Sequence, residues 1–254
     1  MPEIERLVGL APQDFAERFE RPARPVVLAG AASHFAATRR FSPDYLSQKL
    51  GNVEIRCKVS ATHLHPDFHA DSLAQMFATE RSTFADFMRA ISEGPERARR
   101  LFTGDEQFLL RRRDGQTTVN EELKVLLDDV EVPPFFPPER LYTVWAWFSG
   151  PGVRTWLHYD NNGCHNLNAQ LTGNKRCALY PPSELRRLYP FLLGGQNPAH
   201  NCSQIDVEAP DAARFPNFGE VEPWRAELEP GDLLFIPACW FHTFLHLGEF
   251  NSNI

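Results

Sequence analysis

Hydrophobic and polar positions follow two different periods in the first half of the chain. Some stretches repeat apolar residues at helical spacing, and others place them at every second position, as strands do. The pattern predicts helices at 12–19, 42–50, 82–91 and 119–127, and strands at 25–30, 53–60 and 107–113. The helix at 42–50 has the clearest limits, because it starts at a serine and is followed by Gly51.

After a proline-rich break the pattern changes to short strands at close intervals. The break is PPFFPP at 133–138, and its two phenylalanines indicate a packed connector rather than a free linker. Strands are predicted at 141–148, 154–159, 167–172, 176–180, 232–237, 243–247 and 250–254, with one helix at 181–188. Many short strands separated by Gly, Pro and Asn turns are typical of a β-sandwich or a jelly-roll barrel.

The composition supports this interpretation. The chain has 254 residues, of which 43% are hydrophobic and 23% charged, so disorder, collagen and coiled coil are excluded as the main architecture. Twenty Phe and 21 Pro against 3 Met favour strands and fixed turns over long helices.

Charge and cysteine content narrow the choice of partners and compartment. The 33 acidic and 26 basic residues give a net charge of −7, the opposite sign to a protein that coats nucleic acid. The longest uncharged apolar stretch, 233–248, is too short to cross a membrane, and the first residues do not resemble a signal peptide. Five cysteines without a CxxC pair lead us to expect a reduced, cytoplasmic protein.

Candidate chemistry begins with His158 and Asp160 in the stretch RTWLHYD. Two residues apart on a strand, the two side chains point to the same face. An imidazole and a carboxylate that converge in this way are two-thirds of a facial triad, which binds Fe(II) and leaves positions open. Without further support, the same pair is more often an ordinary histidine and aspartate at the end of an exposed strand.

A third ligand is expected near the C-terminal end. The stretch GDLLFIPACWFH at 231–242 reads as a turn, a buried strand, a proline break and a histidine. A jelly roll places distant strands side by side, so the long gap between His158 and His242 is compatible with one metal site. His246 is the rival ligand, and either histidine could instead lie in the core with a backbone partner.

Three blocks in this order resemble the cupin-like, JmjC-type Fe(II)- and 2-oxoglutarate-dependent oxygenases. They are HYD at 158–160, LTGNKRCALYPP at 171–182, and the stretch ending at His242. Within that family, residues 203–218 resemble the asparaginyl hydroxylases that inhibit hypoxia-inducible factor. The stretch ending at His242 resembles the tRNA wybutosine hydroxylases as much. The resemblance runs from about Phe15 to the end of the chain and is strongest from Tyr142 onward.

The resemblance implies a fold and a set of site residues. The fold would be mainly β, a double-stranded β-helix (cupin jelly roll) over 140–254, with an N-terminal α/β extension over 1–139 and surrounding helices in one domain. The implied iron ligands and catalytic residues are His158, Asp160 and His242. The implied residues for 2-oxoglutarate are Thr155, Asn166, Lys175 and Asn253. Physical chemistry supports Lys175 independently, because a dicarboxylate in an apolar barrel needs a cation at its far end.

Two features depart from the family pattern. The pocket tyrosine of the family falls near Phe108, so its hydroxyl is missing here. The loop between Asp160 and Asn166 is two residues longer than in the asparaginyl hydroxylases, and His165 in that loop could intrude on the metal.

Two other groups of residues are candidate binding sites. His63, His65 and His69 could chelate zinc, but Pro66 interrupts the strand and no cysteine accompanies them, so a surface or substrate-lid loop is favoured. A basic run covers Arg97, Arg99, Arg100 and 111–113. A solvated face is the usual meaning of such a run, with a patch for an acidic substrate as the alternative.

Together these features predict an Fe(II)/2-oxoglutarate dioxygenase that uses O₂ to hydroxylate a protein or peptide side chain or a small molecule. The alternatives are a non-catalytic cupin that binds or senses a ligand, a zinc or manganese cupin, and a tRNA-nucleoside hydroxylase. The oligomeric state stays open, with a homodimer among the arrangements compatible with the resemblance.

Overall fold

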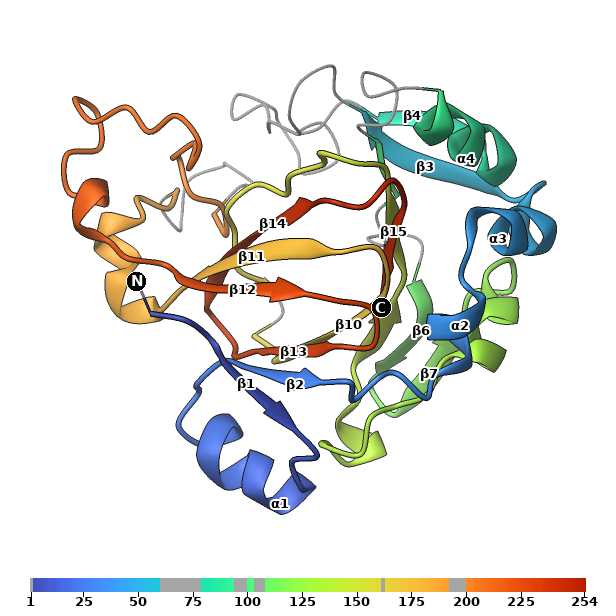
Figure 1. Ribbon diagram of the computed structural model, residues 1–254, viewed down its shortest axis with the longest axis horizontal. Coiled ribbons are helices and arrows are strands. Elements are labelled where there is room, and N and C mark those ends of the chain that lie inside the picture. Colours follow the sequence, from blue (N-terminus) through green and yellow to red (C-terminus); the bar gives the residue numbers. More distant parts are fainter. Residues whose placement is uncertain (1, 60–78, 94–99, 103–107, 161–162, 192–199) are drawn as a thin grey trace.

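The computed structural model describes residues 2–59, 79–93, 100–102, 108–160, 163–191 and 200–254 (Figure 1). More of these residues lie in strands than in helices, so the fold class is mainly β. The strands are β1 (Glu5–Val8), β2 (Val26–Ala29), β3 (Glu54–Val59), β4 (Thr79–Thr83), β5 (Arg100–Phe102), β6 (Phe108–Arg113), β7 (Gln116–Val119), β8 (Thr143–Trp145), β9 (Trp147–Ser149), β10 (Asn166–Thr172), β11 (Lys175–Tyr180), β12 (Trp224–Leu228), β13 (Leu233–Ile236), β14 (Phe241–His246) and β15 (Asn251–Asn253). The α-helices are α1 (Pro12–Phe15), α2 (Ala36–Arg40), α3 (Pro43–Leu50) and α4 (Phe84–Ser92).

Two sheets build the centre of the molecule. The larger has the order β1-β2-β13-β10-β15-β9-β5-β3-β4. A smaller one has the order β12-β11-β14, whose three strands lie side by side in Figure 1. Cys177 and Leu179 of β11 and Phe244 of β14 share one buried apolar cluster with Leu234 and Ile236 of β13. The two sheets therefore pack against each other with an apolar layer between them. A further sheet has the order β7-β6-β8.

Strand alternation places three basic side chains on the inner side of the smaller sheet. Lys175 has the same parity on β11 as Cys177, and His242 and His246 have the same parity on β14 as Phe244. Since Cys177 and Phe244 belong to the layer between the sheets, the three basic side chains face the same interior.

The N-terminal part is joined to the core by both strand pairing and packing. β2 pairs antiparallel with β13 and parallel with β1. The ring of Phe15 lies 5.0 Å from that of Phe235, and 5.1 and 5.5 Å from those of Phe135 and Phe136. The proline-rich break is therefore a packed connector, as its phenylalanines indicate.

Several predicted elements are confirmed. The helix at 42–50 is α3, with Ser42 Oγ accepting a hydrogen bond from the backbone N–H of Tyr45 (3.2 Å). The helix at 82–91 corresponds to α4, whose Phe84, Phe87 and Met88 are buried.

The helix predicted at 119–127 is wrong. Val119 ends β7, a turn follows, and a 3₁₀ helix spans Lys124–Asp129. The buried side chains of Leu123 and Leu126 are three residues apart, a spacing that a 3₁₀ helix satisfies as well as an α-helix. Asn120 also accepts a hydrogen bond from the N–H of Glu122 (3.0 Å), which favours a turn at this point.

Two predictions beside the candidate site also need correction. The helix predicted at 181–188 is the 3₁₀ helix Pro182–Arg187. The strand predicted at 154–159 is not a regular strand, because only single bridges join it to its neighbours. The strand predicted at 176–180 is confirmed as β11, which begins one residue earlier at Lys175.

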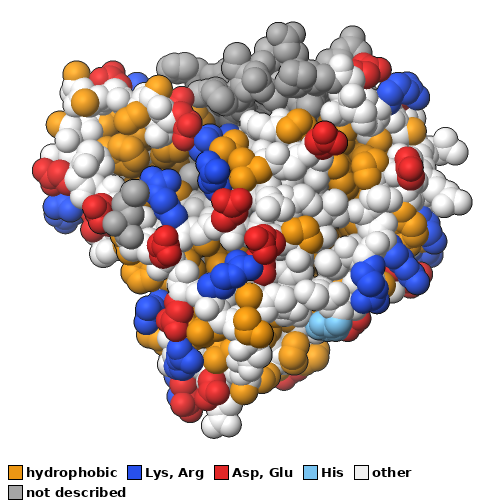
Figure 2. All heavy atoms as spheres, in the orientation of Figure 1, with side chains coloured by type: hydrophobic (Ala, Val, Ile, Leu, Met, Phe, Trp, Pro, Cys, Tyr) orange, Lys and Arg blue, Asp and Glu red, His pale blue; other side chains and the backbone are white. Residues whose placement is uncertain are grey.

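On the face seen in Figure 2, acidic and basic side chains are interspersed, without a continuous basic field. Among the described residues, no helix has the length and apolar character that crossing a membrane requires.

Candidate metal centre

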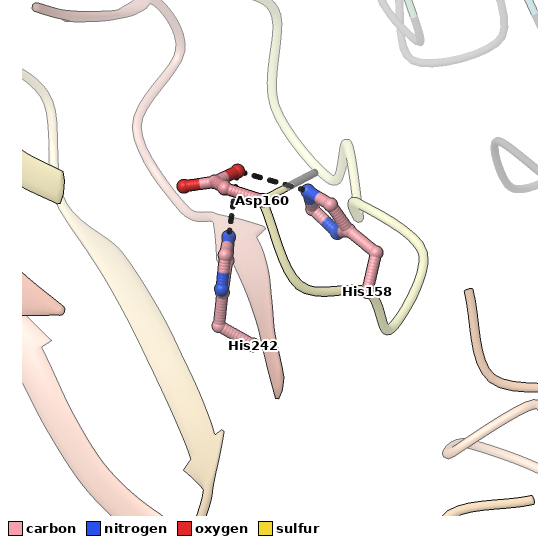
Figure 3. A group of neighbouring side chains, drawn as sticks. All are labelled: His158, Asp160 and His242. Carbon is pink, nitrogen blue, oxygen red and sulfur yellow. Dashed lines mark ion pairs between the residues drawn. The ribbon is translucent and has the colours of Figure 1, made fainter. Parts of the chain in front are cut away.

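His158, Asp160 and His242 meet near the start of β14 (Figure 3). Nε2 of each histidine lies 3.9 Å from Oδ1 of Asp160, and the three ligand atoms lie within 4.8 Å of one another. The two imidazole rings are 4.5 Å apart between centroids. Among the residues that the structure describes, this is the group of His, Cys, Asp or Glu side chains able to hold a metal ion.

Backbone carbonyl groups orient both imidazoles. Nδ1 of His158 donates a hydrogen bond to the carbonyl of Trp156 (2.7 Å), and Nδ1 of His242 donates to that of Trp240 (3.1 Å). With the proton on Nδ1, each Nε2 presents a lone pair toward Asp160, where a metal ion would sit.

Asp160 is held in its ionised form. Burial alone would raise the pKa of this carboxyl, but the electrostatic effect of the neighbouring His242 and His158 and a hydrogen bond from Asn166 lower it below its ordinary value. The Asn166 amide donates to Oδ2 (3.0 Å), which leaves Oδ1 directed at the histidines. An ionised carboxylate in a fixed rotamer is the form that binds a divalent cation.

The segment that carries His158 runs along the edge of β14 with one extra residue. The bridges Arg154–Leu245 and His158–His242 are four residues apart on this segment and three apart on β14. An inserted residue of this kind reverses the alternation of side chains beyond it. Thr155 and His158 can therefore face the same side, which strict alternation would prevent.

Residues 201–203 hold the opposite edge of the same segment. Asn201 exchanges hydrogen bonds with the backbone of Tyr159, donating through Nδ2 (2.8 Å) and accepting through its carbonyl (3.0 Å). The indole of Trp156 donates to the carbonyl of Ser203 (2.7 Å). Sequence reasoning missed this support, because no local pattern relates residues 201–203 to residues 156–159.

His246 lies away from the metal group. Its side chain is buried, and its Nδ1 forms a short hydrogen bond with Ser149 Oγ. Burial, and secondarily the charge of Lys175, lowers the pKa of His246 well below its ordinary value. His246 is therefore a neutral, hydrogen-bonded histidine of the interior.

Lys175 is a buried cation without an acidic partner in the described part of the chain. Its side chain is 1% exposed, and its Nζ lies 4.5 Å from the centroid of the Phe244 ring. Burial lowers the pKa of Lys175 to about 7. A buried ammonium in this state is stabilised by any anion that can enter beside it.

The other residues expected to bind 2-oxoglutarate lie on β15, on β10 and on the segment that bridges to β14. Thr155 Oγ1 accepts a hydrogen bond from the N–H of Phe244 (2.9 Å), so its own proton remains free to donate. Asn253 is buried on β15, opposite Trp147 and Gln170. Asn166 lies at the start of β10, and its amide donates a hydrogen bond to Asp160 of the metal group.

His165 does not join the metal group. Its Nδ1 accepts a hydrogen bond from the N–H of Ala238 (3.1 Å), and its ring stacks on Phe136 with centroids 6.1 Å apart. Instead of intruding on the metal, His165 supports the loop that leads into β14. Phe108, at the expected position of the pocket tyrosine, packs under the guanidinium of Arg111 at 4.3 Å.

The donor set fits Fe(II), and the buried cation fits a dicarboxylate. Two imidazoles and one carboxylate on one side of an octahedral ion leave three positions open, whereas a structural zinc site is closed by four protein ligands. The ammonium of Lys175, which has no acidic partner among the described residues, would match the charge of a carboxylate bound in this interior.

His63, His65 and His69 lie outside the described residues, as do Arg97 and Arg99 of the basic run. Arg111, Arg112 and Arg113 lie on β6.

Comparisons with known proteins agree with this geometry. The family model of the cupin-like domain matches residues 12–254. The tRNA wybutosine-synthesizing protein 5 of Danio rerio is 32% identical over 214 residues, which cover 82% of this chain and 61% of the relative. The protein of the same name from Homo sapiens is 29% identical over 248 residues, covering 95% of this chain and 73% of the relative.

Lysine-specific demethylase 8 of Xenopus tropicalis is 28% identical over 242 residues, which cover 91% of this chain and 47% of the relative. The chain thus spans about half of the demethylase and 61% of the Danio rerio relative. These relatives do not single out the asparaginyl hydroxylases, so the resemblance holds at the level of the wider family.

Proposed function

The chain belongs to the cupin-like domain family and to its JmjC-type, 2-oxoglutarate-dependent iron oxygenases, and we propose that it hydroxylates its substrate with Fe(II) held by His158, Asp160 and His242. The single observation that carries this proposal is the convergence of the three ligand atoms within 4.8 Å, with the Nδ1 atom of each histidine bonded to a backbone carbonyl and its Nε2 directed at Asp160. When bound, Fe(II) and 2-oxoglutarate supply the oxidation, in which O₂ and 2-oxoglutarate give succinate, CO₂ and one oxygen atom inserted into a substrate C–H bond.

The protein's own residues bind and orient the reactants. We propose that Lys175 neutralises the distal carboxylate of 2-oxoglutarate and that the Thr155 hydroxyl donates to it. Asn253 and Asn166 would line the pocket, with Asn166 also holding Asp160. The apolar layer that includes Phe244 and Ile236 would keep bulk water from the reacting groups.

We propose that the packed sheets form the double-stranded β-helix of a cupin jelly roll over 140–254, with 1–139 as an extension within the same domain. Support comes from the apolar layer shared by β11, β13 and β14, and from the pairing of β2 with β13.

The substrate that we propose is a protein or peptide side chain or a small molecule. The net charge of −7 and the interspersed charges in Figure 2 argue against a surface that binds nucleic acid without sequence preference. A tRNA nucleoside is the second candidate, favoured by the names of the Danio rerio and Homo sapiens relatives. A local basic surface would suffice for that substrate.

An anaerobic titration tests the proposed function. Fe(II) followed by 2-oxoglutarate should produce a weak visible charge-transfer band in the native protein and none in Asp160→Ala. A non-catalytic cupin or a zinc cupin would give no such band with either protein. Substrate-stimulated succinate release, measured with peptide, metabolite and tRNA pools, would then identify the substrate class.

A further inference from the structure

His246 stands beside Lys175 in the interior, and the proposed function leaves it without a role. The two residues are direct partners in the ladder between β11 and β14. Directly opposed residues of an antiparallel pair have Cβ atoms about 5 Å apart and point to the same face. His246 and Lys175 are 3% and 1% exposed, so both polar ends lie inside the protein.

No described carboxylate compensates this pair of basic groups. The pKa of Lys175 is lowered by burial and raised slightly by Cys177, and that of His246 is lowered by burial and by Lys175. One carboxylate entering this space can neutralise one cation. A second cation would remain uncompensated, so a neutral histidine beside a charged lysine matches the charge of a single carboxylate group.

Ser149 determines what the neutral imidazole presents to the interior. Its hydroxyl bonds to Nδ1 of His246, and the serine itself is fully buried on β9. If the hydroxyl donates, the imidazole proton must be on Nε2. The ring then offers an N–H donor on the side opposite Ser149.

We propose that His246, with its tautomer set by Ser149, donates a hydrogen bond from Nε2 to the distal carboxylate of 2-oxoglutarate beside Lys175. This inference rests on the proposed function and adds a cofactor-binding residue to it. With this bond, the pocket would select 2-oxo acids that carry a second carboxylate. Only that carboxylate can both accept the hydrogen bond from His246 and neutralise the charge of Lys175.

The experiment measures binding rather than turnover. The anaerobic, Fe(II)-loaded protein is titrated with 2-oxoglutarate, and the charge-transfer band gives its Kd; pyruvate, which lacks the distal carboxylate, is titrated as the matched ligand. His246→Leu removes the donor, whereas His246→Gln keeps an N–H donor at nearly the same reach. Circular dichroism and the melting temperature confirm that each variant is folded, and the Fe(II) affinity is measured separately.

We expect His246→Leu to raise the Kd of 2-oxoglutarate about tenfold, since a hydrogen bond to a charged group is lost. His246→Gln should stay within about threefold of the native protein, and the Kd values for pyruvate and Fe(II) should not change. Ser149→Ala, which removes the partner of Nδ1, should weaken 2-oxoglutarate binding less than His246→Leu does.

Equal losses for 2-oxoglutarate and pyruvate, or equal losses in His246→Leu and His246→Gln, would overturn the inference. If His246→Leu does not fold, the inference is tested with His246→Gln and Ser149→Ala instead. A Kd of 2-oxoglutarate that is unchanged in Ser149→Ala but strongly raised in His246→Gln would contradict the donor role of His246. Absence of the band in the native protein would instead refute the proposed function itself.

Discussion

Asn166 binds the oxygen of Asp160 that the two histidines leave free. Its amide donates to Oδ2 (3.0 Å), while Oδ1 lies 3.9 Å from Nε2 of both His158 and His242. Oδ1 of Asp160 is therefore available to a metal ion, while Oδ2 is held by a hydrogen bond within the protein.

Asn166→Ala should lower the affinity for Fe(II) about 10–100-fold, because partners that orient a ligand typically contribute this much. Metal binding measured by competition with a chromogenic chelator would show the effect. Asn168→Ala is the control, since Asn168 lies two residues along the same strand face. Equal loss in both variants would mean that the strand, and not the bond to Asp160, was disturbed.

Asp160→Ala should abolish both iron retention and turnover. Two neutral imidazoles alone hold Fe(II) poorly, because the carboxylate supplies the only negative charge of the group. Metal content after gel filtration and succinate formation are the measurements. Full activity in this variant would refute the triad.

Substitution of the two histidines of β14 should affect different properties of the protein. His242→Ala should lose bound iron while the melting temperature changes little. His246→Ala should retain iron at low temperature but melt earlier, because it removes a buried ring and leaves Ser149 without its partner. Metal content and melting temperature are measured on the same samples. Loss of iron in His246→Ala, with a lower melting temperature in His242→Ala, would show that His246 is the ligand.

Lys175 should make the stability of the ligand-free protein depend on pH. The folded protein releases its proton near pH 7, whereas the unfolded chain keeps it up to the ordinary value of 10.5. Between these values the unfolded state binds more protons, so stability rises with pH and is lowest below about pH 7. The Lys175 contribution approaches about 1.4 kcal/mol per pH unit within that window.

Melting temperatures at pH 7 and pH 9 test this dependence. Lys175→Met should melt higher than the native protein at pH 7, with the difference shrinking toward pH 9. Excess 2-oxoglutarate should remove the difference by supplying an anion. A constant difference at both pH values would mean that the lysine is not deprotonated in the folded state.

The same substitution separates cofactor binding from metal binding. Lys175→Met should raise the Kd of 2-oxoglutarate by at least about tenfold, because a charge-assisted contact is lost. Its Fe(II) affinity should be unchanged. If iron affinity falls and the 2-oxoglutarate Kd does not, the cation for the distal carboxylate lies elsewhere.

Local pattern was enough to predict the class of fold and most of its elements. The strands around Lys175 and before His242 could be predicted because alternation and turn residues act over a few positions. The same reasoning failed at 119–127, where apolar spacing of three fits two kinds of helix. It also failed at 154–159, whose path depends on β14 and on residues 201–203 rather than on its own sequence.

By itself the sequence determined the kinds of groups available: an HxD pair, a lysine after a glycine turn, and two histidines four residues apart. Only the tertiary structure decided how they are used. It brought His242 to Asp160, put His246 against Ser149, and placed Asn166 on the ligand carboxylate. It also buried Lys175 and thereby shifted its pKa. These outcomes depend on contacts between residues far apart along the chain, and on the desolvation that burial imposes, which no local pattern encodes.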